Sequence, residues 1–179
     1  MRQVALIRGI NVGRAKRIAM ADLRALVERL GYRDVRTLLN SGNVVFTSGS
    51  SPTTAAKRIE SAIEKELGVS ARVIVLTSDE VKQVVKENSL ADRADNPSRL
   101  LIAVFGPAAA DRAKLASLEK EKRGNDALVI GTRAAYLWCP DGILASRHVE
   151  DFMRYLGETA TTRNWSTVLK LQGALGSKS

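Results

Sequence analysis

The chain of 179 residues contains a single cysteine, Cys139, and a single histidine, His148. One cysteine excludes an internal disulfide and agrees with a reducing compartment. With so few thiol and imidazole groups, the sequence also lacks the ligands of an ordinary zinc site. Cys139 ends an apolar segment beside Trp138, which favours an inert core thiol over a reactive thiolate. We therefore expect no metal site, and the sequence identifies no cofactor.

Long hydrophobic runs are absent as well. No apolar stretch approaches the roughly 20 residues that span a bilayer, and no hydrophobic leader with a cleavage site opens the chain. The composition, 45% hydrophobic and 26% charged, is that of a globular protein. We expect a cytoplasmic protein without a membrane partner.

Acidic residues are missing from the start of the chain. Residues 1–17 carry five basic side chains and no acidic one, and residues 1–50 carry nine basic and three acidic side chains. Since the formal net charge of the whole chain is +9, much of the excess is concentrated here. A local field of one sign attracts phosphates or carboxylates, although non-specific attraction to nucleic acid would have the same origin.

Most of this basic stretch is the segment LIRGINVGRAKR, from Leu6 to Arg17. It reads as the end of a buried strand followed by a loop with Gly9 and Gly13, before a helix that begins near Met20. Backbone amides between a strand and a helix are available to an anion. The glycine spacing matches neither a Walker loop nor a dinucleotide fingerprint, so an ordinary connecting loop with solvated arginines remains an alternative.

The first part of the chain predicts the order β-α-β-β-α-β. Helices are expected from Met20 to Leu30 and over a segment that places Ile59, Ile63 and Leu67 on one face. The strands are Val4–Ile7, Asp34–Leu39, Val44–Phe46 and Arg72–Leu76, with the turn Asn40–Asn43 between the second and third. This order is the ferredoxin-like arrangement.

The second part predicts a degenerate copy of the same order. Thr77 and Glu80 fit a capping box that opens a third helix, and Asn88–Ser98 reads as a loop. The following elements are a strand Leu100–Phe105, a helix Asp111–Lys122, strands Ala127–Ile130 and Ala134–Cys139, and a helix His148–Leu156. The chain then shows a helical pattern from Ala160 to Leu171 instead of a last strand.

The fold class expected from this order is α+β, with two ferredoxin-like subdomains of which the second is degenerate and ends in helices. We expect an N-terminal subdomain over 1–77, a helix and connecting loop over 78–98, a C-terminal subdomain over 99–172 and a frayed tail over 173–179.

Three segments are similar to a known family. They are RGINVG at Arg8–Gly13, MADLRALVERLGYRDVRTLLNSGNVVF from Met20 to Phe46, and ATTRNWSTVLKL from Ala160 to Leu171. Together they resemble the bacterial family catalogued as domain of unknown function 1697. The resemblance implies an α+β fold with two ferredoxin-like subdomains and no established activity. The chain departs from the family pattern at Arg14 and Ala15, where a glycine and a lysine are common, and at Ala19, where a proline is usual.

No set of residues assembles an obvious active site. Ser41 is a candidate nucleophile by position only, because the one histidine lies far away in the sequence on an expected helix. Asp22 and Asp34 are explained by helix-start and turn preferences. Of the residues on the expected inner strands only Phe46 is aromatic, which argues against the stacking mode of RNA-recognition domains.

The sequence therefore predicts a binding site for a small anionic or phosphate-bearing ligand at one end of the first sheet. Its candidate residues are Arg8, Gly9, Asn11, Gly13, Lys16, Arg17, Ser41, Asn43, Arg163 and Asn164. The opening loop and the turn Asn40–Asn43 flank antiparallel neighbours, so they should meet. Arg163 and Asn164 are included because an arginine in the first turn of a helix opposes the helix dipole and so calls for a partner, either a carboxylate of the protein itself or an external anion. A small transferase or hydrolase of phosphorylated substrates, and non-specific nucleic-acid binding, remain the alternatives.

Overall fold

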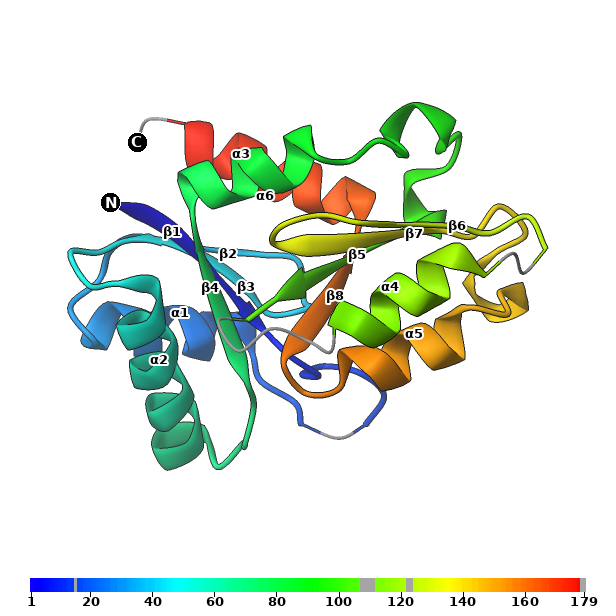
Figure 1. Ribbon diagram of the computed structural model, residues 1–179. Helices are drawn as coiled ribbons and strands as arrows, with labels where there is room; N and C mark the ends of the chain where they lie inside the picture. The colour runs from blue at the N-terminus through cyan, green and yellow to red at the C-terminus, as the bar shows by residue number, and fades with distance from the viewer. Residues whose placement is uncertain (15, 107–111, 122–123, 178–179) are drawn as a thin grey trace. The chain divides into compact units, whose positions relative to one another are not determined.

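The computed structural model describes residues 1–14, 16–106, 112–121 and 124–177 (Figure 1). The chain forms two compact units, one made of Met1–Val81 with Leu171–Ser179, the other of Lys82–Lys170. Each described unit contains one four-stranded antiparallel sheet. The α+β fold with two ferredoxin-like halves is thereby confirmed.

The sheet of the first unit has the strand order β2-β3-β1-β4. Its elements are β1 (Arg2–Ile7), α1 (Met20–Arg29), β2 (Arg33–Leu38), β3 (Asn43–Thr47), α2 (Pro52–Leu67) and β4 (Val73–Thr77). Strand β1 pairs with β3 through Leu6 opposite Asn43, and with β4 through Ile7 opposite Val73. This register puts the loop after β1, the turn before β3 and the start of β4 at the same end of the sheet.

Helices α1 and α2 lie on one face of this sheet (Figure 1). The helix faces buried there carry Leu23, Leu26 and Val27 from α1, and Ile59 and Ile63 from α2. Residues 4–7 of β1 are all buried, so side chains on both faces of the central strand are withdrawn from solvent. A sheet buried in this way does not display a surface on which bases could stack.

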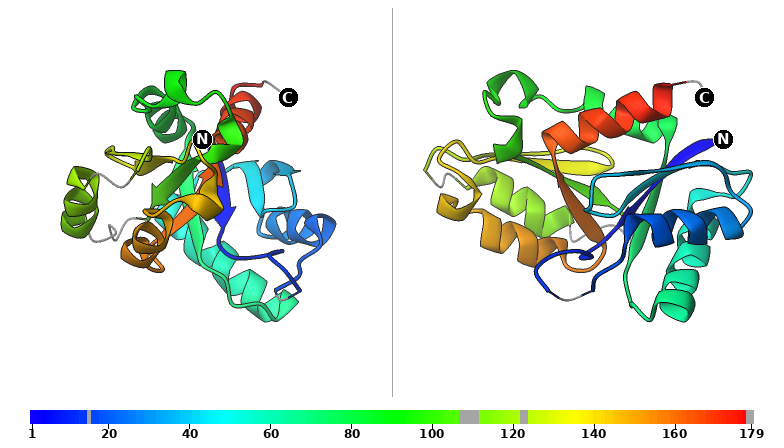
Figure 2. Two further views of the ribbon diagram at one scale, coloured as in Figure 1. Left: turned by 90° about the vertical axis from the view of Figure 1, so that its right-hand side faces the viewer. Right: turned by 180° about the vertical axis from the view of Figure 1, so that it is seen from behind.

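The second unit repeats the strand order as β6-β7-β5-β8. Its elements are β5 (Leu100–Phe105), α4 (Arg112–Lys120), β6 (Ala127–Ile130), β7 (Ala134–Trp138), α5 (Val149–Leu156) and β8 (Ala160–Asn164). Helices α4 and α5 lie side by side (Figure 2). Their side chains Leu115, Leu118, Phe152 and Leu156 pack with the sheet into one core. The predicted helix ends at Asp111 and Lys122 lie outside the described residues.

The described residues also form the α-helices α3 (Ser78–Lys86) and α6 (Trp165–Gly176), and short 3-10 helices at Ala91–Arg93, Pro97–Arg99 and Ile143–Ala145. Helix α3 begins with the predicted capping box: Thr77 N–H donates to Glu80 Oε2 at 2.9 Å, and Glu80 N–H donates to Thr77 Oγ1 at 3.2 Å. No described helix is long and apolar enough to cross a membrane.

The prediction for the end of the chain is wrong in one respect. Residues Ala160–Asn164 form strand β8 and do not start a helix, so the second half has the complete β-α-β-β-α-β order and is not degenerate. Thr162 and Arg163 lie opposite Ala103 and Ile102 of β5. The helix begins only at Trp165, and it continues to Gly176, inside the segment 173–179 that the sequence predicts to be a tail.

Candidate functional site

The loop between β1 and α1 has a fixed base and an exposed tip. Ile10 and Ile18, at its two ends, are buried in the core of the first unit. Between them, Asn11 N–H donates to the carbonyl oxygen of Lys16 at 3.1 Å, which closes the intervening segment. Gly9, Asn11, Gly13 and Lys16 all have positive φ angles, from 51° to 67°. Four residues in the left-handed region turn the chain sharply, and glycine and asparagine tolerate that region best.

The side chain of Asn11 holds this loop in place. Its Oδ1 accepts a hydrogen bond from Ile18 N–H at 2.9 Å, and its Nδ2 donates to Ile18 O at 2.9 Å. The same Nδ2 donates to the backbone oxygen of Asn40 at 2.8 Å. Both amide hydrogens of Asn11 are therefore used inside the protein. The sequence predicts Asn11 as a ligand-binding residue, whereas its hydrogen bonds join the loop to the turn before β3.

The turn before β3 is packed directly against the same loop. Ile7 N–H donates to Gly42 O at 2.8 Å. Gly42 has φ of 78°, and a Cβ at this position would lie 2.7 Å from Ile10 Cδ1. Glycine is needed here for its backbone conformation and for the close approach of Ile10. The loop and the turn thus meet, as predicted, through the Ile7–Gly42 backbone hydrogen bond, the hydrogen bond of Asn11 to Asn40 and the packing of Ile10 on Gly42.

Asn43 and Ser41 are joined to each other by a hydrogen bond within the turn. Asn43 is fully buried, and its Nδ2 donates to Leu38 O and to Ser41 Oγ, each at 2.9 Å. Ser41 is exposed, and His148, the only imidazole, belongs to the other unit. There, His148 Nδ1 and Nε2 face Asp126 Oδ2 and Glu121 O, each at 3.3 Å. His148 is thus a buried residue held by its own surroundings.

The charged groups at this end of the sheet lie on the loop tip and on one residue that the sequence did not suggest. Gly13, Arg14, Lys16 and Arg17 are exposed, while Arg8 is half-buried. Within the described residues, Arg14, Lys16 and Arg17 form no ion pair. Arg72, also exposed, is brought to the loop because Arg8 N–H donates to Arg72 O at 2.8 Å. The register of β1 with β4 is what places it there, and no local signal in the sequence indicates it.

Arg163 and Asn164 lie in the second unit, at the end of β8. Arg163 is 8% exposed and donates to Thr161 Oγ1 at 2.9 Å and to Thr162 O at 2.8 Å. Burial lowers the pKa of its guanidinium to about 10. Asn164 Oδ1 caps helix α6, since it accepts a hydrogen bond from Thr167 N–H at 3.0 Å. Neither residue stands in a helical first turn, so the dipole argument that singled them out does not apply.

A buried polar cluster in the second unit was not anticipated from the sequence. Ser146 Oγ donates to Asp126 Oδ2 at 2.6 Å, and the same carboxylate faces His148. Burial raises the pKa of the neighbouring Cys139 thiol to about 11; a hydrogen bond with Ser146 partly opposes this shift, and the Asp126 charge adds to it. A thiol with a raised pKa stays protonated at neutral pH and is a poor nucleophile. Asp126 thus joins Ser146 to His148 beside a thiol that is a poor nucleophile.

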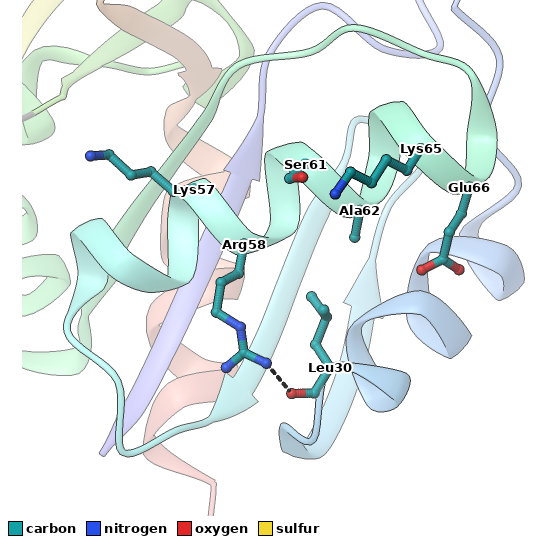
Figure 3. Close-up of a pocket in the computed structure, with 7 residues that line it drawn as sticks. All are labelled: Leu30, Lys57, Arg58, Ser61, Ala62, Lys65 and Glu66. Carbon is teal, nitrogen blue, oxygen red and sulfur yellow. Dashed lines mark hydrogen bonds between the residues drawn. The ribbon is translucent and has the colours of Figure 1, made fainter.

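A hollow of about 430 Å³ lies elsewhere in the first unit, between α2 and the end of α1 (Figure 3). It is lined by Leu30, Lys57, Arg58, Ser61, Ala62, Lys65 and Glu66. Arg58 Nη2 donates to Leu30 O at 2.9 Å, its guanidinium lies 5.3 Å from the centre of the Tyr32 ring, and Glu66 pairs with Arg29. Two of its charged groups therefore hold α2 to α1 and to the residues that follow α1.

A second hollow, of about 260 Å³, adjoins the first and shares Leu30 and Arg58 with it. Its lining includes Arg33 and Thr47, which pair with each other, and Thr47 also lies opposite Arg2 at the start of β1. The second hollow thus lies toward the end of the sheet that is remote from the basic loop, and none of the predicted site residues lines either hollow. Among described residues, no group of three or more His, Cys, Asp or Glu side chains is placed to hold a metal ion.

Comparison with known proteins supports the fold. The model of a family described as "Protein of unknown function (DUF1697)" matches residues 1–136. The solved structure of conserved bacterial protein SP0830 from Streptococcus pneumoniae aligns with a TM-score of 0.75 and 21% sequence identity, over 97% of this chain and 98% of that one. No curated protein matches the sequence. At this identity the structural likeness establishes the fold alone.

Proposed function

The chain belongs to the DUF1697 family, whose description assigns no activity, and we propose that its first unit binds a small anionic or phosphate-bearing ligand through the loop 8–17 and the turn 40–43. The observation that carries this proposal is the arrangement of Arg14, Lys16 and Arg17. They are exposed on a loop whose base is pinned by Asn11 and by two buried isoleucines. A backbone that is already fixed loses little conformational freedom when an anion binds, so that only the side chains have to be ordered.

The ligand is held by side-chain charge and by backbone amides at the tip of the loop. Lys16 and Arg17 supply charge, Arg14 and Arg72 extend the positive field, and the amides near Gly13 offer donors to oxygen atoms. Asn11 and Asn43 act indirectly, because their amide groups hold the loop and the turn in the shape that presents these cations. Arg163 and Asn164 are not needed for this arrangement.

Binding is tested with the purified protein, inorganic phosphate and a panel of nucleotides and sugar phosphates, by thermal shift and calorimetry at low and high salt. Replacing Lys16 and Arg17 together by alanine should weaken binding at least tenfold and change the free energy of unfolding by less than about 1 kcal/mol, as for other surface changes. The matched control removes two exposed lysines on other elements, Lys120 and Lys170. Equal weakening in the control would show a diffuse charge effect.

Two alternatives give different results in the same screen. A transferase or hydrolase would turn over a phosphorylated substrate and would lose turnover when Ser41 or Asn43 is replaced. Non-specific nucleic-acid binding would appear as affinity for every polyanion, falling steeply with salt and indifferent to sequence. A selective shift that survives high salt supports the binding site.

A further inference from the structure

Two exposed apolar side chains lie on the segments that form the proposed anion site. Val12 is 73% exposed and Leu39 is 46% exposed. Val12 follows Asn11 in the loop, and Leu39 precedes Asn40 in the turn. Because Asn11 Nδ2 donates to Asn40 O at 2.8 Å, the two apolar residues flank one hydrogen bond. Most other residues of their size in the first unit are buried in its core.

Leu39 is held in a backbone conformation that disfavours leucine. Its φ is 58°, in the left-handed region, where a side chain with a Cβ is strained and where glycine or asparagine is preferred. Leu39 also hides only about half of its surface, so burial offsets this strain incompletely. Strain and exposure at the same residue point to a role beyond folding.

Val12 is exposed between two residues with left-handed backbone conformations. It stands between Asn11 and Gly13, whose φ angles are 56° and 63°, and these two turns direct the segment away from the core that Ile10 and Ile18 enter. The next charged residues along the loop are Arg14, Lys16 and Arg17. Apolar and cationic groups are therefore interleaved on one short, closed loop.

We propose that the ligand of this site is amphipathic: a small molecule in which a phosphate or carboxylate is joined to an apolar group, the anion facing Lys16 and Arg17 and the apolar group covering Val12 and Leu39. This inference rests on the proposed anion-binding function and narrows its ligand class. The cations of the loop attract the anionic group of such a ligand, and its apolar group covers two side chains that an inorganic anion would leave in water.

The test compares phenyl phosphate with inorganic phosphate, by calorimetry on the full chain. The wild-type protein should bind phenyl phosphate at least tenfold more tightly than inorganic phosphate, which corresponds to about 1.4 kcal/mol. In the double variant Val12→Ser with Leu39→Asn this preference should fall below threefold, while the affinity for inorganic phosphate changes by less than twofold. Leu144→Asn, at another exposed leucine, is the matched control and should keep the full preference.

The stability of the Leu39→Asn variant is the second readout. Because asparagine tolerates the left-handed region, this variant should melt at the same temperature as the wild type or higher. If Leu39→Asn binds phenyl phosphate more weakly and is at least as stable as the wild type, Leu39 contributes to binding and not to packing. A lower melting temperature would show that Leu39 serves the fold, and would overturn its assignment.

The outcomes separate this inference from the function on which it rests. Equal affinities for both probes, or a preference that survives in the double variant, would overturn the amphipathic ligand and leave anion binding standing. No binding of either probe would overturn both. If phenol bound as tightly as phenyl phosphate, the anionic group would be shown not to matter. If the protein bound only vesicles containing phosphatidylserine, the ligand would be a membrane surface and not a small amphipathic anion.

Discussion

Tyr32 shows at the scale of one residue how a buried polar group and an aromatic contact can oppose each other. Its ring stacks on Phe46 with a centroid distance of 4.8 Å, and Arg58 covers it at 5.3 Å. Its hydroxyl is buried and, within the described part of the chain, has no hydrogen-bond partner. The ring contributes to packing, whereas an unpaired buried hydroxyl costs about 1–3 kcal/mol.

We therefore predict that Tyr32→Phe leaves the free energy of unfolding unchanged or raises it by up to about 2 kcal/mol, since the stack stays and the unpaired hydroxyl is removed. Tyr32→Ala removes the ring and should lower the free energy of unfolding by about 3–5 kcal/mol. Urea unfolding followed by circular dichroism measures both. If Tyr32→Phe proves as damaging as Tyr32→Ala, the hydroxyl has a partner that stabilises the fold.

The opening loop shows at the scale of an element how an asparagine amide can replace regular secondary structure. The side chain of Asn11 donates two hydrogen bonds, to Ile18 O and Asn40 O, and accepts one from Ile18 N–H. Asn11→Gly preserves the positive φ and removes all three, so we expect a loss of about 1–3 kcal/mol in the free energy of unfolding. Amide exchange in the loop should become faster, and phosphate affinity should fall.

The control for this prediction is Asn40→Ala. Asn11 bonds to the backbone oxygen of Asn40, which alanine retains, and the side chain of Asn40 is exposed. Asn40→Ala should therefore stay within about 0.5 kcal/mol of the wild type. A comparable loss in both variants would mean that the turn, and not the Asn11 amide, holds the loop.

The elements of the first unit were predictable because their signals are local. The periodic leucines of α1, Gly31 after its end and the Thr77–Glu80 capping box each act within a few residues. Strand β8 was not predictable in this way. The segment Ala160–Asn164 is a strand because it pairs with the edge of β5, more than 50 residues away in the sequence. This long-range pairing overrides the local helical pattern.

The candidate site was predictable only in position. Alternation of strand, loop and turn places residues 8–17 and 40–43 at one end of the sheet, and hydrogen bonds join the two segments. The sequence did not predict the structural role of Asn11 and Asn43, because their amide groups bond to backbone carbonyls that only the fold brings near. Arg72 was missed because its position depends on the register of β1 with β4.

At the scale of the whole molecule, the two halves share a topology and differ in charge. The order β-α-β-β-α-β occurs twice, with the same arrangement of strands in each sheet. The first unit nevertheless carries 14 basic and 8 acidic side chains, whereas the second carries 14 basic and 11 acidic ones. The same fold thus places a basic loop after the first strand of the first unit, which concentrates the proposed binding function there.

The end of α6 belongs to the first unit rather than to the unit in which the helix begins. Leu171 and Leu175 are buried, and the guanidinium of Arg2 in β1 donates to the carbonyl oxygens of Ala174 and Ser177. Leu175→Ala should lower the free energy of unfolding by about 2–4 kcal/mol, because it leaves a cavity in a buried contact. Leu169, on the same helix, is 41% exposed, and Leu169→Ala should change stability by less than about 0.5 kcal/mol.

Hydrogen exchange then shows which sheet this contact supports. In Leu175→Ala the amides of β1 and β4 should lose protection before those of β5 and β7, since the truncated side chain belongs to the first unit. The opposite order, or equal losses from Leu175→Ala and Leu169→Ala, would contradict this assignment. If the expected order holds, the last turns of α6 close the first unit, although more than 90 residues separate them from β4 along the chain.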